Sequence, residues 1–385
     1  MTPVQALGAA RPGRAARELE RHSRRSRTLP EGDVALLDAG DPDAPTAEHV
    51  RRALHEAVEA GATHYGHPFG DPDLRAALAA RASATTGWPV APGRVLVTHG
   101  ASGGLGAAIL ATVDPGDRVL LQDPTYSLYA DQVRVAGGLP VSVPTRPDFH
   151  LDAERLAAAA PGARMIVLCH PSNPTGVVHS RDELEAVAAI AERHDLLVLA
   201  DEAYDAIIHP PTRFVSTLEI PALEPRLLYC QTLSKTYAMT GWRVGWVIAP
   251  EPLAAAVGRL HVTLHGPMNT AVQRAALAAV TGPDDATGEM LRTYARRRSH
   301  VIAALAAMPG VVCPPPEATF YAFLRYPQAV DAVTMQARCL EGGVALRAGS
   351  EFGDGGERHL RLSYTAADDD LDRGLERLAA VLARP

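Results

Sequence analysis

The chain has 385 residues, of which 47% are hydrophobic, so it is long enough to bury a large core and is not a disordered protein. Its formal net charge of -7 argues against a nucleic-acid-binding protein, whose domain would be basic. No apolar run reaches the roughly 18 residues that a membrane helix requires, so we expect neither a membrane nor a nucleic-acid partner.

The first predicted element is an Arg-rich segment, residues 11–27, whose composition is similar to that of a transit peptide. It contains Glu18 and Glu20 and has no apolar secretory core, so we interpret it as a helical arm. We expect residues 1–45 to form this arm and a loop that pack with the C-terminal domain. The four cysteines are scattered without a CxxC pair, which fits the reducing cytoplasm and predicts no metal site.

Seven short apolar runs follow, separated by Ala-rich helical stretches such as the one that the capping box of Ser180 and Glu183 opens. Most runs do not alternate, as expected of strands that are covered on both faces. Strands that alternate with helices predict a mainly parallel sheet. We therefore predict an α/β fold, a three-layer αβα domain over residues 46–285 with a seven-stranded sheet. The predicted strands are residues 95–98, 118–122, 140–143, 164–169, 196–200, 227–232 and 243–249.

After about residue 285 the pattern changes to short strands and helices around a Pro-rich stretch at 314–316. This pattern predicts a smaller α+β domain over residues 286–385. Its expected helices are residues 289–307, 330–341 and 368–382, and its expected strands are residues 319–324, 344–347 and 360–364.

Several strands of the predicted sheet end in Gly-rich or polar turns, and open α/β sheets bind ligands beyond the carboxyl ends of their strands. After the strand at 95–98, a Gly-rich turn with Gly100, Ala101 and Ser102 leads into a helix expected from about residue 105, whose free N–H groups suit a phosphate. Tyr126 follows the next strand, and Asn173 lies in a turn fixed by two prolines and a glycine. Each of these patterns alone also fits an ordinary turn.

Two further strand ends carry ionisable groups. Asp201 ends a buried apolar strand, where a carboxylate is costly unless it has a partner, although a helix cap is an alternative. Lys235, eight residues before Arg243, is the only lysine among 37 Lys and Arg residues. Lysine can lose its proton and attack a carbonyl, whereas arginine stays protonated. We interpret Lys235 as retained for nucleophilic chemistry, the alternative being survival by chance.

Taken together, these motifs resemble the class I/II aminotransferases, the aspartate aminotransferase branch of fold-type I pyridoxal phosphate enzymes. The resemblance runs from about residue 37 to 378. It rests on Ser-Lys at 234–235 followed by Gly-Trp-Arg-Val-Gly at 241–245, and on Asn-Pro-Thr-Gly at 173–176 followed by Ala-Asp-Glu-Ala-Tyr at 200–204. It implies that Lys235 holds pyridoxal 5'-phosphate as a Schiff base and carries the proton of the reaction, while Asp201 pairs with the pyridine nitrogen.

The resemblance also implies roles for other residues around the cofactor. Asn173 and Tyr204 would bond the phenolic oxygen of the ring, and Tyr126 would stack on it. Tyr65 would reach the phosphate of a neighbouring subunit, so we expect a homodimer with shared active sites. The residues expected to hold the phosphate are Gly100, Ala101, Ser102, Thr232, Ser234 and Arg243.

Substrate contacts are expected from Asn173, from Gly40 in the loop at 38–42, and from Arg361, whose bidentate guanidinium suits a carboxylate. The implied reaction moves an amino group between an amino acid and a 2-oxo acid. The same residues also serve lyases, cyclases and decarboxylases, which therefore stay open. A non-catalytic effector-binding domain is a further alternative, disfavoured because the short arm before Gly40 leaves no room for a helix-turn-helix. The sequence does not identify the donor or the acceptor; candidates for the side-chain pocket are His67, Phe69, His265, Asn269 and Tyr321.

Overall fold

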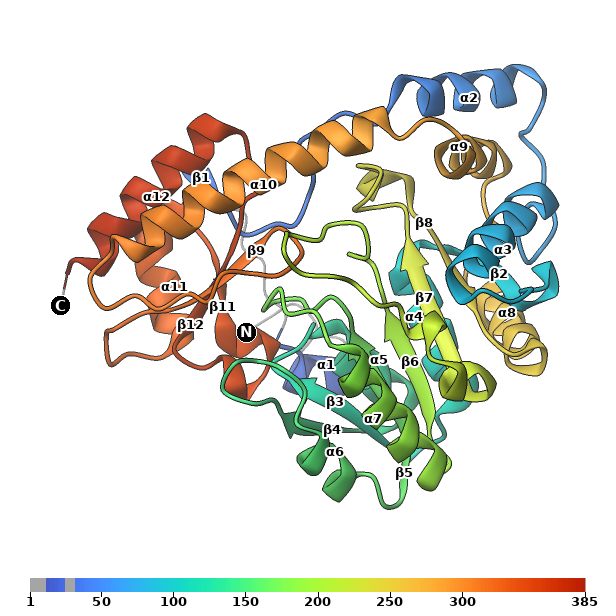
Figure 1. Cartoon of the computed structure of the whole chain (residues 1–385), viewed down its shortest axis with the longest axis horizontal. Helices are drawn as coiled ribbons and strands as arrows, with labels where there is room; N and C mark the ends of the chain where they lie inside the picture. The colour runs from blue at the N-terminus through green and yellow to red at the C-terminus, as the bar shows by residue number, and fades with distance from the viewer. Residues whose placement is uncertain (1–11, 25–31, 385) are drawn as a thin grey trace.

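The computed structural model describes residues 12–24 and 32–384 (Figure 1). Residue 11 and residues 25–27 of the Arg-rich segment lie outside the described residues. In the part of the chain that is described, no helix is both long enough and apolar enough to cross a membrane.

The larger part of the molecule is built on the predicted seven-stranded sheet, with strand order β2-β8-β7-β6-β5-β3-β4. Each predicted strand is present to within one residue at either end. Strand β8 runs antiparallel to both of its neighbours, and the other pairs are parallel. The strands are β2 Val95–His99, β3 Arg118–Asp123, β4 Leu139–Pro144, β5 Ala163–Cys169, β6 Leu197–Asp201, β7 Leu227–Thr232 and β8 Val244–Ile248.

Helices cover both faces of this sheet, which explains why its strands are apolar throughout. In β5, for example, Ile166 packs into one hydrophobic cluster and the next residue, Val167, packs into the cluster on the opposite face. The three-layer αβα fold is therefore confirmed. The helices of this part are α2 Glu48–Glu59, α3 Pro72–Thr86, α4 Gly100–Thr112, α5 Leu128–Ala136, α6 Ala153–Ala159, α7 Arg181–Arg193, α8 Glu251–His265 and α9 Thr270–Thr281.

The C-terminal part is the smaller α+β unit, with its own hydrophobic cluster around Tyr294, Phe320 and Leu362. Figure 1 shows the long helix α10 (Asp285–Ala306) running from the neighbourhood of α9 to this unit, where it contacts α12 and β9. An antiparallel sheet has the order β11-β12-β9. The remaining elements are β9 Tyr321–Arg325, α11 Ala332–Glu341, β10 Val344–Ala345, β11 Arg347–Ala348, β12 His359–Ser363 and α12 Asp368–Leu382.

One predicted strand of this unit is corrected by the structure. Residues 344–347 are not one strand but two, because β10 pairs in parallel with β1 (Ala35–Leu36) whereas β11 pairs with β12. Leu346, between them, is the point at which the chain changes sheets. This change places Arg347 directly opposite Arg361 on β12.

The amino-terminal segment contacts both parts of the molecule. Strand β1 pairs with β10 of the C-terminal part, whereas helix α1 (Arg14–His22) packs on α5. The Ser23 hydroxyl donates a 2.7 Å hydrogen bond to Asp131 of α5. The neighbouring Arg24 forms a 2.7 Å ion pair with Asp354 of the C-terminal part. The arm therefore bridges the two parts.

Candidate active site

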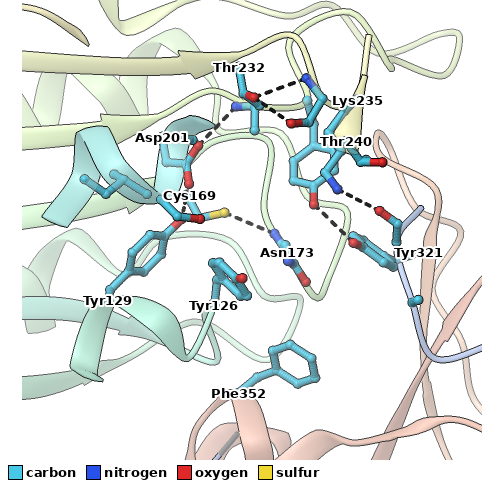
Figure 2. Close-up of a pocket in the computed structure, with 18 of the residues that line it drawn as sticks. Tyr126, Tyr129, Cys169, Asn173, Asp201, Thr232, Lys235, Thr240, Tyr321 and Phe352 are labelled. Atoms are coloured by element: carbon cyan, nitrogen blue, oxygen red, sulfur yellow. Dashed lines mark hydrogen bonds between the residues drawn. The ribbon is translucent and has the colours of Figure 1, made fainter. Parts of the chain in front are cut away.

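A cavity of about 370 Å³ lies between the carboxyl ends of the parallel strands and the C-terminal part (Figure 2). Figure 2 shows Asp201, Asn173 and Tyr126 surrounding one space, with Phe352 facing them from the C-terminal part. The cavity brings together most of the residues predicted from the sequence. These are Gly40, Ala101, Ser102, Tyr126, Asn173, Asp201, Tyr204, Thr232, Ser234, Lys235, Arg243 and Arg361.

Lys235 lies in the turn that follows β7. Thr232 fixes this turn, because its Oγ1 accepts a 3.1 Å hydrogen bond from the Ser234 N–H and donates one of 2.9 Å to the Val244 carbonyl. Nζ of Lys235 donates a 2.7 Å hydrogen bond to the carbonyl of Gly40. Burial lowers the pKa of the Lys235 ammonium; Tyr321 and Asp41 act in the opposite direction, and the charges of Arg361 and Arg243 lower it further. The neutral amine is therefore more accessible than in an exposed lysine.

Asp201 ends β6 and is only 5% exposed. Its carboxylate accepts hydrogen bonds from the Tyr129 hydroxyl at 2.8 Å and from the Ala203 N–H at 3.3 Å. Burial raises the pKa of Asp201 to about 6, although these two hydrogen bonds act in the opposite direction. A buried carboxylate whose bonded partners are both uncharged suits a cationic group in the cavity. This is the property that a protonated pyridine nitrogen requires.

Arg243 and the beginning of α4 form a cradle for an anion. Arg243 itself has a positive φ of 57°, and its Nη1 donates a 2.8 Å hydrogen bond to the Thr240 carbonyl. A Cβ at Gly100 would lie 2.5 Å from Nη2 of Arg243, so only glycine lets the guanidinium approach the helix. Ala101 and Ser102, which line the cavity, are in the first turn of α4, where N–H groups have no helical partner. A phosphate fits this combination of charge and free N–H groups.

Arg361 lies on β12, in the wall of the cavity that the C-terminal part forms. Its Nη1 donates a 2.9 Å hydrogen bond to Oδ1 of Asn173, and its Nη2 donates one of 2.7 Å to the Asp38 carbonyl. The guanidinium also lies 4.1 Å from the ring centre of Tyr321 and 4.8 Å from that of Phe352. These bonded partners are uncharged, and Nε has no hydrogen-bond partner among the residues that the structure describes. The fork is therefore held in place with its charge available to a carboxylate.

Glycine is required at position 40 by the packing of the loop over the cavity. A Cβ on Gly40 would come within 1.8 Å of the Tyr321 hydroxyl oxygen. The same hydroxyl lies 3.1 Å from the hydroxyl of Tyr204. The loop, the large domain and the C-terminal part therefore meet at Tyr321.

The cavity also contains residues that the sequence did not reveal. Tyr129, which holds Asp201, is one helical turn beyond Tyr126, and no sequence pattern predicted its role. Arg347 shares the face of Arg361 because the two are directly opposed in β11 and β12, and it forms an ion pair with Glu351. Arg347 and Glu351 both line the cavity. Finding this pair requires the strand register, which the sequence does not contain.

Tyr65 does not reach the cavity of its own chain. Its side chain is 92% exposed, although its segment is fixed by a 2.7 Å hydrogen bond from the Thr270 hydroxyl to the His64 carbonyl. Among the candidates for the side-chain pocket, Tyr321 lines the cavity. The others, His67, Phe69, His265 and Asn269, do not line it in the described part of this chain.

Comparison with known proteins agrees with this geometry. The family described as aminotransferase class I and II matches residues 32–378. The chain is 36% identical to the aspartate aminotransferase of Streptomyces avermitilis, over 91% of this chain and 89% of that protein. It is also 36% identical to the aspartate/prephenate aminotransferase of Thermus thermophilus, over 91% of this chain and 92% of that protein.

Solved structures show the same likeness. The aromatic aminotransferase of Pyrococcus horikoshii superposes with a TM-score of 0.90 at 32% identity, covering 96% of this chain and 98% of that one. The aspartate aminotransferase of Thermus thermophilus with maleate gives 0.87 at 32% identity, covering 99% and 100%.

Proposed function

We propose, from the premise that the chain belongs to the class I and II aminotransferases, that the cavity around Lys235 is its active site. The protein is a fold-type I, pyridoxal 5'-phosphate-dependent aminotransferase, and its substrates are an amino acid and a 2-oxo acid. The observation that carries the assignment of the site is the convergence of Lys235, Asp201 and Arg361 on one space. Each offers a different chemical property: a nucleophilic amine, a buried carboxylate and a carboxylate-binding fork.

The residues around the cavity fit the cofactor. When bound, pyridoxal phosphate supplies an electron sink that stabilises negative charge at the substrate Cα. Arg243 and the amino end of α4 would hold its phosphate, and Asp201 would hold its pyridine nitrogen. Two observations support this fit. The carboxylate of Asp201 is buried and its bonded partners are uncharged. Gly100 also lets Arg243 approach the amino end of α4 closely.

Around the ring, Tyr126 would stack on one face while Asn173 and Tyr204 bond the phenolic oxygen. Thr232 and Ser234 would complete the phosphate site together with Gly100, Ala101 and Ser102. These residues line the cavity, which supports the proposal. Gly100 does not line it and contributes through its close approach to Arg243.

Lys235 would hold the cofactor through Nζ and then move the proton of the reaction. With Nζ free, its neutral amine would accept the proton from the substrate Cα. The lowered pKa of Lys235 favours this neutral form. Arg361 would meanwhile bind the substrate carboxylate with Gly40 beside it, so that Cα is presented to Nζ.

The side chain of the substrate would face Arg347 and Glu351. Relatives named aspartate aminotransferase support the proposal that one of the two substrates has a second carboxylate. Arg347 is the cation that such a carboxylate would meet on the C-terminal wall. Glu351 already pairs with Arg347, so binding of a second carboxylate would require that pair to open.

Three further points are proposals about the whole protein. The exposed Tyr65 supports a homodimer in which each subunit completes the phosphate site of the other. The four free cysteines support a cytoplasmic location. Separate hydrophobic clusters support a division into a cofactor domain over residues 46–285 and a C-terminal domain over residues 286–385 with the N-terminal loop.

A spectroscopic half-reaction tests the function. The purified protein should be yellow, and borohydride should fix the cofactor on Lys235, the only lysine, as read by peptide mass. Adding amino acids one at a time should convert the cofactor from its aldehyde to its amine form without release of ammonia. Ammonia with the aldehyde form regenerated would instead identify elimination, and a colourless protein that takes up no pyridoxal phosphate would refute the assignment of the cavity.

A further inference from the structure

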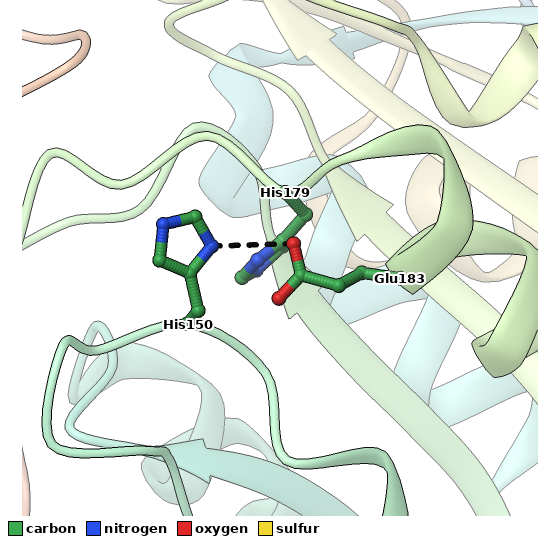
Figure 3. Close-up of side chains that lie close together, drawn as sticks. All are labelled: His150, His179 and Glu183. Carbon is green, nitrogen blue, oxygen red and sulfur yellow. Dashed lines mark hydrogen bonds and ion pairs between the residues drawn. The ribbon is translucent and has the colours of Figure 1, made fainter.

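A second group of side chains with metal-binding chemistry lies outside the cavity (Figure 3). His150 is in the loop between β4 and α6, His179 is just before α7, and Glu183 is in the first turn of α7. Figure 3 shows the ring of His150 facing the carboxylate of Glu183, with the ring of His179 beside them. Each residue offers one ligand atom, and these atoms all lie within 4.8 Å of one another.

His179 has a buried nitrogen that nothing in the described structure satisfies. His179 is only 1% exposed, and its Nδ1 has no hydrogen-bond partner among the described residues. Its Nε2 lies 2.9 Å from the side-chain amide of Gln122. Buried polar atoms are normally paired, so an orphan nitrogen of this kind indicates a missing water or ion. A histidine that ligates a metal through one nitrogen usually has the other held by an amide or carboxylate, as Gln122 holds Nε2 here.

Neighbouring side chains fix the orientation of the His179 ring. The ring of His170 stacks on it at 5.3 Å with an interplanar angle of 15°. Gln122 holds its Nε2 from the side. An imidazole that is already oriented loses little freedom when it binds a metal.

His150 and two carboxylates complete a pocket for positive charge. Nδ1 of His150 lies 3.2 Å from Oε2 of Glu183, and its Nε2 lies 3.7 Å from Oε1 of Glu317. Two ligands about 2.0–2.1 Å from one tetrahedral zinc ion would be roughly 3.4 Å apart, which is close to the first of these distances. The other oxygen of Glu183, Oε1, lies 3.7 Å from Arg146 and accepts the Leu151 N–H at 3.0 Å, whereas Oε2 is the oxygen that faces His150.

We propose that His150, His179 and Glu183 bind a divalent transition-metal ion such as Zn²⁺, with a water molecule as the fourth ligand. Two imidazoles and one carboxylate are a ligand set that zinc accepts. Oε2 of Glu183 also accepts the Ser180 N–H at 2.8 Å, but a carboxylate oxygen has a second lone pair for the metal.

The site joins the loop between β4 and α6 to the segment that leads into α7. That segment follows Cys169 at the end of β5 and includes Asn173 of the cavity. Glu317 of the C-terminal part accepts the Val178 N–H of the same segment at 2.8 Å. A metal here would therefore hold the segment that carries Asn173, as a structural site that takes no part in amino-group transfer.

The test uses cofactor-loaded enzyme that has been treated with a chelator and desalted. We expect wild-type protein to bind one Zn²⁺ per chain in a calorimetric titration and by elemental analysis after gel filtration. Mass action predicts that saturating metal raises Tm by a few degrees. His179→Phe, which keeps a stacking ring, and His150→Asn should each lower the affinity at least tenfold. His300→Asn, which breaks the exposed pair of His300 with Asp372 at 2.6 Å, is the matched control and should bind as wild type does.

Absence of saturable binding in the wild-type protein would overturn the proposal, as would stoichiometric binding that persists in both variants. Should either variant fail to fold, the visible spectrum of Co²⁺ in the wild-type protein decides, because a tetrahedral nitrogen and oxygen site gives intense bands and a hydrated surface ion does not. An octahedral, weakly absorbing Co²⁺ spectrum would count against the site. All of these measurements are independent of transamination.

Discussion

The two walls of the cavity are built differently. In the wall from the large domain, Tyr129 holds Asp201 and Val244 holds Thr232, both within the same domain, while Nζ of Lys235 bonds to the Gly40 carbonyl of the N-terminal loop. The wall from the C-terminal part holds Arg361 through groups that lie elsewhere, on Asn173 and Asp38. We infer that the first wall is a rigid frame for the chemistry, whereas the second depends on how the parts meet and is suited to selecting the substrate.

This difference can be tested because changes in the two walls should have different kinetic signatures. Substitutions in the wall from the large domain should lower kcat for every substrate. Damage to the C-terminal wall should change KM and the preference among substrates.

Replacing Lys235 should abolish the reaction with all donors. Loss of a positioned proton-transfer group costs on the order of 10⁴-fold in rate, and Lys235→Ala also removes the point of attachment. Lys235→Arg is the matched variant, because it keeps the positive charge but cannot deprotonate. Single-turnover rates with two chemically different donors should fall equally in both variants. Substantial activity in the arginine variant would show that charge, and not proton transfer, is what Lys235 supplies.

Arg361→Lys should lower kcat/KM by roughly 10²-fold, since a truncated partner of a buried charged pair costs about 2–5 kcal/mol. Most of the loss should appear in KM, because lysine keeps the charge but not the two-pronged contact with the carboxylate. Arg325→Lys, on the exposed end of the adjacent strand β9, is the control and should leave both constants unchanged. An equal loss of kcat for every donor would show that Arg361 supports the chemical step itself, and the two walls of the cavity would then not differ in function.

Asp201→Asn should lower kcat for every donor while stabilising the cofactor-free protein at neutral pH. The folded apoprotein binds the Asp201 proton more tightly than the unfolded chain, because burial raises the pKa from 3.8 to about 6. The wild-type apoprotein therefore loses stability as pH rises from about 4 to 6, and the loss persists above that range. Thermal unfolding of both apoproteins should show the variant more stable at pH 7.5 and the difference shrinking toward pH 4. A difference that does not depend on pH would contradict this reading of Asp201.

Glu351→Gln should have the smallest effect and should act on preference. Removing the negative charge of Glu351 from beside Arg347 should favour donors with a second carboxylate over uncharged donors by about tenfold, a pairwise charge effect of roughly 1.4 kcal/mol. The ratio of kcat/KM for aspartate and alanine measures it. Asp354→Asn changes the charge of the same loop outside the cavity and is the control. An unchanged ratio would mean that the ion pair of Arg347 and Glu351 stabilises the C-terminal wall of the cavity but does not select the substrate.

The sequence predicted the large domain well because its strands are covered on both faces and read as continuous apolar runs. It did not predict that residues 344–347 split between two sheets, because such short strands carry no periodic signal. Lys235 and Asp201 were visible at strand ends, but Arg361 was found only through the family motif. Arg347 and the cluster of His150 and His179 depend on register and on contacts between distant segments, which a single sequence does not encode.

Tyr65 has a consequence for inheritance. In the proposed homodimer, the exposed Tyr65 of one chain serves the site that contains the other chain's Lys235. A chain that has lost Lys235 could still donate its tyrosine, and a chain that has lost Tyr65 could still catalyse beside an intact neighbour. Two alleles, each defective alone, would then complement one another, since every mixed pair would contain one whole site.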